Sequence, residues 1–470
     1  MNDINGKTLL QLGFPEGKSI GIALGLLEKH HLDASANLSL LTGVLQCPEF
    51  YLDHPVFDLL AQSLIEQKNT ESKNILLKEK ADSYPIYGKE YIEQGALDQM
   101  NTAMKLPVTL RGALMPDAHQ GYGLPIGGVL ATKNAVIPYG VGVDIGCRMA
   151  LSVYDIPADY FEGNRHSFKR ELIAFTKFGA GNAWRGNEKA YHPVLESHDF
   201  KMNSFITKLY DKAAEQLGTS GGGNHFVEWG ILDILQEDKS INIPKGKYVA
   251  LLSHSGSRGL GATIAGYYTR LAKEKCVLPK EAANLAYFDL NSEEGMEYWI
   301  AMNLAGSYAS ACHQVIHDRL TKAIGAELLG RVENHHNFAW KEMVNDQEAI
   351  VHRKGATPAS EGTLGIIPGS MTAPGFLVRG RGELNSINSA SHGAGRQMSR
   401  TRALATVTKD EMKKILADHG VTLIGGDRDE APMAYKDINQ VMHAQQDLVD
   451  IIARFQPKIV RMADDGSKED

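Results

Sequence analysis

The sequence has few cysteines, and none of them are paired by spacing. Its 470 residues include four, at positions 47, 147, 276 and 312, and no Cys-x-x-Cys pair occurs. A disulfide framework and a zinc finger both need cysteines at closer and more regular spacing. Cys147 can therefore serve as a ligand for a metal ion.

Long apolar runs and an excess of basic residues are also missing. No uninterrupted apolar run approaches the roughly 20 residues of a membrane span, and the start MNDINGKTLL lacks the regions of a signal peptide. We therefore expect a cytoplasmic protein without a membrane partner. The net charge of −7 lacks the basic excess of proteins that follow a nucleic-acid backbone. Any nucleic-acid surface must be local.

Glycine is abundant, with 47 residues, and the most informative glycine-rich stretch is GVGVDIGC at 140–147. It places Asp144 and Cys147 three positions apart in a turn where glycines leave room for a ligand. One hard and one soft ligand together suit a divalent transition ion. The same stretch is also compatible with a strand and a tight turn in which Cys147 is a small buried apolar residue.

Histidines further along the chain favour the metal interpretation. The stretch GTSGGGNHFVEWG carries His225, flanked by Asn224 and Glu228, and SHSGSRGLG carries His254 at the end of an apolar strand. Arg258 follows in a loop before a helix expected to start near Leu260, an arrangement typical of an anion site. A third candidate comes from the adjacent pair at 335–336, of which one member can face a given side of a strand.

Together these segments supply five ligand-type side chains, enough for two metal ions that share the Cys147 thiolate. A basic loop rich in Gly and Ser follows, with His392 at the mouth of a helix expected near Arg396. The residues alone indicate a two-metal phosphoryl-transfer enzyme. Taken singly, each histidine is also compatible with a hydrogen-bonded core imidazole.

The hydrophobic patterns predict an α/β (α+β) protein with a sheet-rich catalytic core and a small helical N-terminal extension. We expect the extension over 1–80, the catalytic domain over 81–462 and an acidic, disordered tail over 463–470. Helices are predicted over 205–217 and 440–455, and a short strand over 458–462.

Seven stretches in this order resemble the motifs of the RtcB RNA ligases: PDAHQGYGLPIGG, GVGVDIGC, GGGNHFVE, SHSGSRGLG, ENHHNFAW, PGSM and SHGAGR. The resemblance spans about residues 85 to 462. It implies an α/β fold peculiar to that family, two Mn²⁺ ions and GTP. It also implies a reaction that joins RNA 3′-phosphate or 2′,3′-cyclic phosphate ends to 5′-hydroxyl ends, and an archease-type accessory protein as a partner.

Carried over position by position, the resemblance implies a role for each matching residue. Asp144, Cys147 and His225 would hold one Mn²⁺ ion, and Cys147, His254 and His336 the other. His336 is chosen over His335 because the family's ligand directly precedes an Asn. His392 would be the residue that becomes guanylylated. Further matches imply nucleotide contacts from Asn224, Glu228, Ser370, His392, Gly393, Gly395 and Tyr435, and RNA or triphosphate contacts from Arg258 and Arg400.

The sequence departs from the family pattern at several points. The family ends in a Lys-Gly pair that reaches the guanine, whereas the aligned position here is Met462. The segment after PGSM reads TAPG rather than GTAS. Two other functions therefore stay open: a metal-dependent phosphodiesterase or phosphatase acting on RNA ends, and a non-catalytic RNA-binding paralogue.

Overall fold

The computed structural model describes residues 4–15, 18–30, 34–71 and 75–464. The chain forms two compact units, Met1–Ile75 and Leu76–Asp470. Most of the predicted acidic tail, residues 465–470, lies outside the described residues. Within the described ranges, no helix has both the length and the apolar character needed to cross a bilayer.

The N-terminal unit is helical, as expected. It contains α1 (Gly6–Gln11), α2 (Lys18–His30), α3 (Ala34–Gln46), the 3-10 helix η1 (Pro48–Tyr51) and α4 (Asp58–Glu71). The Asn5 side chain accepts hydrogen bonds from the amides of Lys7 and Thr8, which fixes the start of α1. Apolar side chains from these helices, among them Leu9, Leu41 and Phe57, form the core of the unit.

The larger unit is organised around an eight-stranded sheet with the path β12-β13-β16-β5-β6-β4-β8 and β15 added beside β16. Only the β15–β16 pair is parallel among its ladders. The strands are β4 (Arg148–Pro157), β5 (Phe226–Ile234), β6 (Gly246–Ser255), β8 (Leu328–His335), β12 (Leu364–Ile367), β13 (Gly375–Gly380), β15 (Thr422–Ile424) and β16 (Val449–Met462). In the central ladders Phe226 pairs with His254, His254 with Met149, and Met149 with Asn334. These pairings align one end of each of the neighbouring strands β5, β6, β4 and β8, so the residues at these ends lie side by side.

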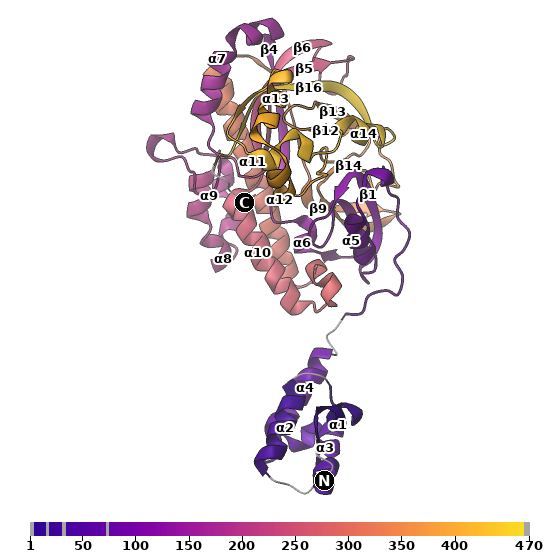
Figure 1. The fold of residues 1–470 in the computed structure, drawn as a ribbon. Coiled ribbons are helices and arrows are strands. Elements are labelled where there is room, and N and C mark those ends of the chain that lie inside the picture. The colour runs from indigo at the N-terminus through magenta and orange to yellow at the C-terminus, as the bar shows by residue number, and fades with distance from the viewer. Residues whose placement is uncertain (1–3, 16–17, 31–33, 72–74, 465–470) are drawn as a thin grey trace. The chain divides into compact units, whose positions relative to one another are not determined.

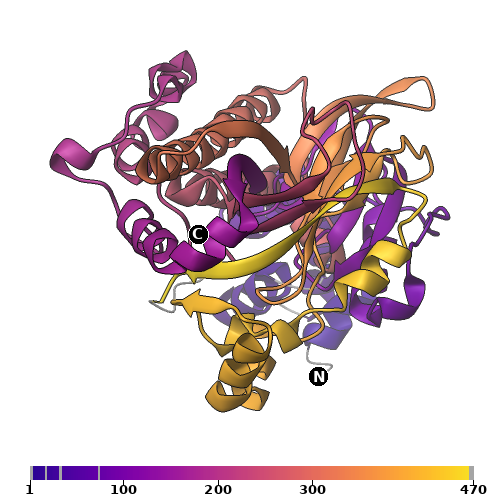
Figure 2. The same cartoon turned by 90° about the horizontal axis from the view of Figure 1, so that it is seen from above.

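The long strand β16 corrects a sequence expectation. The segment 440–455 was expected to be one helix, but only α14 (Ile438–His443) is helical there, and the strand starts at Val449. Figure 2 shows β16 as the long yellow strand that crosses the larger unit. Pro457, which lacks an amide hydrogen, is compatible with this strand because the ladder to β5 is irregular between Pro457 and Ile459.

A second, four-stranded sheet has the order β1-β2-β10-β9, formed by β1 (Thr109–His119), β2 (Ile126–Thr132), β9 (Asn337–Val344) and β10 (Gln347–Lys354). Two short pairs complete the strands: β3 (Ala135–Val136) with β7 (Phe288–Asp289), and β11 (Ala356–Pro358) with β14 (Ser389–Ser391). The β11–β14 pair leads directly into His392.

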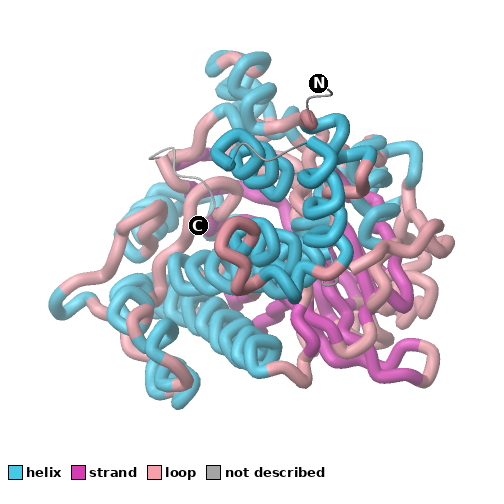
Figure 3. Tube along the Cα trace, turned by 90° about the horizontal axis from the view of Figure 1, so that it is seen from below, coloured by secondary structure: helices cyan, strands magenta, loops and turns pink. Residues whose placement is uncertain are grey.

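Three long helices pack against the large sheet or one another: α7 (Ala158–Phe175), α10 (Arg258–Lys275) and α11 (Glu293–Ile324). Figures 1 and 3 show these helices gathered beside the strands rather than between them. The other helices are short: α5 (Gln94–Met104), α6 (Pro138–Val141), α8 (Ser204–Thr207), α9 (Tyr210–Gln216), α12 (Arg400–Thr406) and α13 (Lys409–Asp418). The helix expected over 205–217 is thus two short helices.

The helix expected near Arg396 starts instead at Arg400. The reason is local, because the Ser399 side chain accepts a hydrogen bond from the Arg402 amide and caps the helix at that point. Residues 392–399 are consequently a loop.

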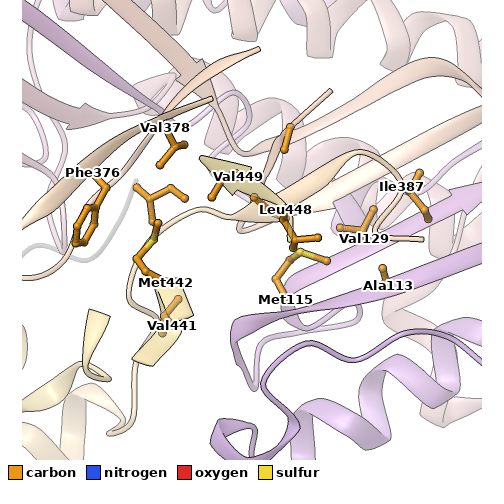
Figure 4. Packing of buried hydrophobic residues seen from close by; sticks show 14 of the residues in the cluster. Ala113, Met115, Val129, Phe376, Val378, Ile387, Val441, Met442, Leu448 and Val449 are labelled. Carbon is orange, nitrogen blue, oxygen red and sulfur yellow. The ribbon is translucent and has the colours of Figure 1, made fainter. Parts of the chain in front are cut away.

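A buried apolar cluster joins β1 and β2 to the C-terminal elements (Figure 4). Ala113 and Met115 of β1 and Val129 of β2 pack with residues of β13 and α14, including Val378 and Met442. Ala390 and Ala394, which flank His392, belong to the same cluster. Asp117 follows Met115 by two positions on the same strand and is itself buried. This packing brings Asp117 to the loop that carries His392.

Candidate active site

The loop 142–147 connects α6 to β4 and is held close to α11. Gly146 has φ +70°, and a Cβ there would lie 2.7 Å from the Cα of Gly306 in α11, so a larger residue does not fit. The Gly146 amide donates to the Asn337 carbonyl at 2.7 Å. Arg148, the first residue of β4, donates to the carbonyls of Gly146 and Gly306 and pairs with Glu333. These contacts fix the backbone between Asp144 and Cys147.

Asp144 is buried and held on both carboxylate oxygens. Oδ2 lies 3.0 Å from Nε2 of His225, and Oδ1 accepts from the Ser257 amide at 3.1 Å. Burial alone would raise the pKa of Asp144, but the hydrogen bond and charge of His225 bring this pKa below its usual range. The carboxylate is therefore ionised, as a metal ligand must be.

The Cys147 sulfur lies between two imidazoles. Sγ is 3.5 Å from Nε2 of His225 and 3.2 Å from Nε2 of His254. The ligand atoms of these three residues all lie within 4.8 Å of one another. Nε2 of His254 is in turn 3.2 Å from Nε2 of His336. The structure thus brings together the five side chains that the sequence predicted as metal ligands.

The donor set fits a pair of metal ions. His254 donates from Nδ1 to the Asn224 carbonyl at 3.2 Å, which leaves the Nε2 lone pair directed at Cys147 and His336. Burial, and then the charge of a neighbouring histidine, lower the pKa of both His254 and His336 well below the usual range. Both rings are neutral, and neutral imidazole is the form that binds metal.

The structure distinguishes the two adjacent histidines. His336 follows the end of β8, and its amide donates to the Cys147 carbonyl at 3.0 Å. His335 is the last residue of β8 and lies instead against the rings of Phe338 and Trp340, with centroid distances of 5.0 and 4.9 Å. His336 is therefore the member of the pair that reaches the site.

His392 lies beside this cluster. Its ring centroid is 5.0 Å from that of His336, and its Nδ1 is 2.6 Å from Oδ2 of Asp117. The His392 amide donates to the same oxygen at 3.2 Å. Because the Asp117 carboxylate accepts a hydrogen bond from Nδ1–H, Nε2 is the ring nitrogen left to carry the lone pair. The imidazole is thus prepared to act as a nucleophile.

Asp117 reaches His392 through an irregularity in β1. The ladder between β1 and β2 shifts register between Leu114 and His119, where Pro116 cannot donate a hydrogen bond. His119 follows on the same strand, with Nδ1 3.0 Å from the Asp117 carbonyl. Burial lowers the pKa of His119 to about 4, so this ring is neutral. Asp117 and His119 thus both lie at the end of β1.

Lys354 is a buried cation near the site. Nζ donates to the carbonyls of Tyr122 at 2.5 Å and Tyr139 at 3.2 Å, and burial lowers the pKa of Lys354 to about 7. The next amide, that of Gly355, donates to the Asn337 side chain at 2.8 Å. A Cβ at Gly355 would lie 3.2 Å from Cε1 of His392, so Lys354 is held one residue away from this ring.

Tyr435 and Arg400 meet around one buried carboxylate. Glu430 is hydrogen-bonded by the Tyr435 hydroxyl and pairs with Arg400 and, at 3.2 Å, with Arg396. Arg396 also lies over the Tyr435 ring, 5.2 Å from its centroid. Burial raises the pKa of Glu430 despite these cations. Arg396 also lines a cavity of about 210 Å³ together with His119 and Lys436.

The remaining predicted nucleotide contacts lie on separate segments. Asn224 precedes His225, and its buried Oδ1 has no hydrogen-bond partner among the described residues. Glu228 is buried in β5, which raises its pKa well above the usual range. Gly393 approaches the Pro368 carbonyl, so the turn that carries Ser370 lies beside the His392 loop.

Gly395 and Arg258 are tightly packed. Gly395 has φ +73°, and a Cβ there would lie 2.1 Å from the Asp117 carbonyl oxygen, which excludes a larger residue. Arg258 is 1% exposed and donates to Thr219 at 3.1 Å and to the Gly179 carbonyl at 2.8 Å. Its φ of +56° is unusual for a residue with a side chain. A contact between Arg258 and substrate stays a prediction.

Sequence reasoning gave no role to Asp117, His119, Lys354 or Asn337. Asp117 and His119 were visible as a polar pair before a glycine-rich turn, which was the available signal. Asn337 served only to identify His336 as the ligand, and Lys354 carried no signal in the sequence, because its importance depends on which loops it joins.

The fold and this cluster define an α/β protein with a candidate two-metal site beside His392, whose imidazole is oriented by a carboxylate. Residues 99–463 match the family model described as tRNA-splicing ligase RtcB. The chain is 34% identical over 389 residues to the RNA-splicing ligase RtcB of Escherichia coli K12, covering 77% of this chain and 92% of that protein. The chain therefore belongs to the RtcB family.

Two further relatives are more distant. The tRNA-splicing ligase RtcB of Nanoarchaeum equitans is 32% identical over 431 residues, covering 77% of this chain and 90% of that protein. The RNA-splicing ligase RtcB homolog 1 of Entamoeba dispar is 28% identical over 508 residues, covering 93% and 90%. The predicted family and the α/β fold are thereby confirmed.

Proposed function

We propose that this chain joins RNA 3′-phosphate or 2′,3′-cyclic phosphate ends to 5′-hydroxyl ends, using GTP and two Mn²⁺ ions. The single observation that carries the proposal is the position of His392. Its Nδ1 is 2.6 Å from the Asp117 carboxylate, and its ring lies against His336 of the ligand cluster. A nucleophile oriented by a carboxylate and placed beside a metal site is what nucleotidyl transfer to a side chain requires.

The proposed ligand sets divide the cluster into two. Asp144, Cys147 and His225 would hold one ion, and Cys147, His254 and His336 the other. The separations of 3.0 to 3.5 Å between neighbouring ligand atoms support a shared thiolate. When bound, the ions would neutralise charge on phosphate oxygens. A site of Cys and His ligands generally binds zinc more tightly than manganese. Selective binding of manganese would therefore depend on the geometry of the site and on metal supply.

In the first proposed step, Nε2 of His392 attacks the α-phosphorus of GTP. A P–N bond forms, the P–O bond to the β-phosphate breaks, and pyrophosphate leaves. Asp117 accepts the hydrogen bond from Nδ1 and stabilises the positive ring that results. The product is a histidine carrying GMP.

In the later steps, an oxygen of the RNA 3′-phosphate attacks the guanylyl phosphorus, and the P–N bond breaks. This restores His392 and leaves an RNA end activated by GMP through a pyrophosphate bond. The RNA 5′-hydroxyl then attacks the 3′-phosphorus, and GMP leaves. A cyclic phosphate end must first be opened by water.

The proposed nucleotide site extends from His392 toward several residues around it. Asn224 supports this placement, because its buried Oδ1 lacks a partner among the described residues. Glu228 would accept from the guanine edge, Tyr435 would stack on the base, and Ser370, Gly393 and Gly395 would contact the nucleotide. Arg400 and Arg258 would hold phosphate oxygens. A cytoplasmic location and an archease-type accessory protein are part of the same proposal.

The test is to incubate the protein with Mn²⁺ and each of the four nucleoside triphosphates and to measure the intact mass. With GTP, we expect a mass increase equal to GMP less one water, and none for His392→Ala. A wild-type protein without an adduct, or His392→Ala with one, would contradict the proposal. Ligation is then measured with a labelled RNA that has a 3′-phosphate and a second RNA with a 5′-hydroxyl.

One observation favours a second candidate, a metal-dependent phosphodiesterase or phosphatase acting on RNA ends. Met462, at the position aligned with the family's terminal lysine, is buried in an apolar cluster with Met371 and Val407. A thioether cannot donate a hydrogen bond to a guanine. Sealing of the two RNAs would exclude this function, whereas loss of the terminal phosphate without sealing would support it.

A further inference from the structure

Two aromatic rings stack beside the proposed catalytic loops. The Tyr122 and Tyr139 rings lie nearly parallel, with a centroid distance of 6.1 Å and an interplanar angle of 17°. Tyr122 lies in the connection between β1 and β2, and Tyr139 lies in α6. Tyr122 is 68% exposed, so much of its ring is accessible to a ligand. We call these two rings the tyrosine platform.

Two lysines accompany the platform. Lys354 Nζ is 5.0 Å and Lys273 Nζ 5.8 Å from the centroid of the Tyr139 ring. Lys354 is buried and joins the backbone carbonyls of both tyrosines, whereas Lys273 is exposed on α10 and donates to Asn284 at 2.7 Å. The platform thus combines an exposed aromatic face with a solvent-accessible cation.

The platform is also held rigidly. Gly123, with φ +74°, approaches the Asn284 carbonyl so closely that a Cβ there would lie 2.8 Å from it. The side chain of Asn284 in turn accepts a hydrogen bond from Lys273. A surface tyrosine on a fixed loop loses little conformational entropy when a ligand stacks on it.

Both tyrosines of the platform lie close in sequence to residues of the proposed active site. Tyr122 follows Asp117 by five residues, which limits their Cα separation to about 18 Å even in a fully extended chain. Asp117 contacts His392 directly. Tyr139 precedes Asp144 by five residues in the same way. A polymer whose end lies at His392 can therefore reach the platform within a few units.

We infer that the tyrosine platform binds a base of single-stranded RNA near the ends to be joined, with Tyr122 stacking on the base and Lys273 attracting a phosphate. This inference rests on the proposed function. An aromatic face beside a cation is the usual surface for an unpaired nucleic-acid strand, because every base has a face that can stack. The local basic character also fits a protein whose net charge is negative.

The test uses the full chain and short RNAs with a 3′-phosphate, in which 2-aminopurine replaces one of the last four nucleotides in turn. We expect fluorescence quenching at one of these positions on binding, since stacking quenches 2-aminopurine. Tyr122→Ala should weaken RNA binding about tenfold and abolish the quenching, and Tyr122→Phe should retain both. Lys273→Gln should weaken binding and reduce its salt dependence.

The control is Tyr160→Ala, which removes a tyrosine of α7 that is 57% exposed. It should bind RNA like the wild type. The inference fails if Tyr122→Ala binds RNA with wild-type affinity and quenching, or if Tyr160→Ala loses as much affinity.

Adduct formation with GTP is measured on the same variants. The GMP adduct should form normally in Tyr122→Ala, which also reports that the variant is folded. A wild-type protein that binds RNA through Tyr122 but forms no GMP adduct would contradict the proposed function. The role of the tyrosine platform in RNA binding would still stand. Normal adduct formation together with unchanged RNA binding in Tyr122→Ala would contradict only the role of the tyrosine platform in RNA binding. Loss of the adduct in Tyr122→Ala and Tyr122→Phe alike would also contradict a role confined to RNA.

Discussion

Nδ1 of His392 lies 2.6 Å from Oδ2 of Asp117, although 275 positions separate the two residues. The contact selects the tautomer of the histidine, because a carboxylate accepts and Nδ1 must donate. The contact also holds the end of β1, a strand of the four-stranded sheet, beside the loop 392–399 that carries His392.

Asp117→Asn should slow formation of the GMP adduct. The amide can occupy the same space but no longer stabilises a positive imidazole, so we expect a loss on the order of 100-fold. The measurement is single-turnover adduct formation across pH, where a change in the apparent pKa of the rate identifies an effect on His392. Asp98→Asn, a change on α5, is the control. An unchanged rate and pH profile would show that Asp117 does not act through His392.

Gly256→Ala should empty the metal site without unfolding the protein. The added Cβ would lie 1.8 and 2.1 Å from the carboxylate oxygens of Asp144, which must move. Metal content measured by mass spectrometry should fall, and adduct formation with it. Gly266→Ala, in α10, is the matched control. There the Cβ meets only Arg270 at 3.6 Å, so we expect stabilisation of roughly 0.5 to 1 kcal/mol.

Cys147→Ala should remove both metal ions rather than one. The sulfur lies within 3.5 Å of His225 and His254, so its loss affects both proposed ligand sets. The measurement is the number of Mn²⁺ ions bound per chain at equilibrium. Cys276→Ala removes another buried thiol and should bind metal normally. Retention of a single tightly bound ion by Cys147→Ala would argue against a shared thiolate.

His352→Gln should make stability less sensitive to acid. His352 accepts from the Ile137 amide at 2.9 Å, its Nδ1 lies 3.2 Å from the Leu130 carbonyl, and burial lowers its pKa to about 4. A folded-state pKa below the unfolded value gives stability that is present above about pH 6.5 and lost as the pH falls toward 4. The unfolded chain takes up the proton first.

Between pH 6.5 and pH 5, this one group should account for about 2 kcal/mol of the decrease in the free energy of unfolding. Urea denaturation at both pH values measures the decrease, which should be smaller in His352→Gln than in the wild type. His119 and His313, with pKa values lowered to about 4 and about 3, act in the same direction and remain in the variant. Equal decreases in the two proteins would contradict the assignment.

The sequence predicted the ligand cluster better than it predicted local structure. Asp144, Cys147, His225 and His254 lie in glycine-rich motifs whose order is distinctive, and the structure brings them together. The choice between His335 and His336 could not be made from alternation, because His336 lies beyond the last residue of β8. Asp117 was not assigned because its role depends on a distant contact. The prediction of one helix over 440–455 was wrong because the run VDIIARF fits the helical period as well as the strand period.

The row of partners Phe226, His254, Met149 and Asn334 also bears on how the protein is made. The proposed metal ligands range from Asp144 to His336, so a growing chain shorter than 336 residues lacks part of the proposed metal site. Until β8 has joined β4, the Cys147 thiol lacks its final neighbour and is exposed to oxidants. Manganese supply and reducing conditions during synthesis should therefore affect the yield of active protein more than they affect the finished fold.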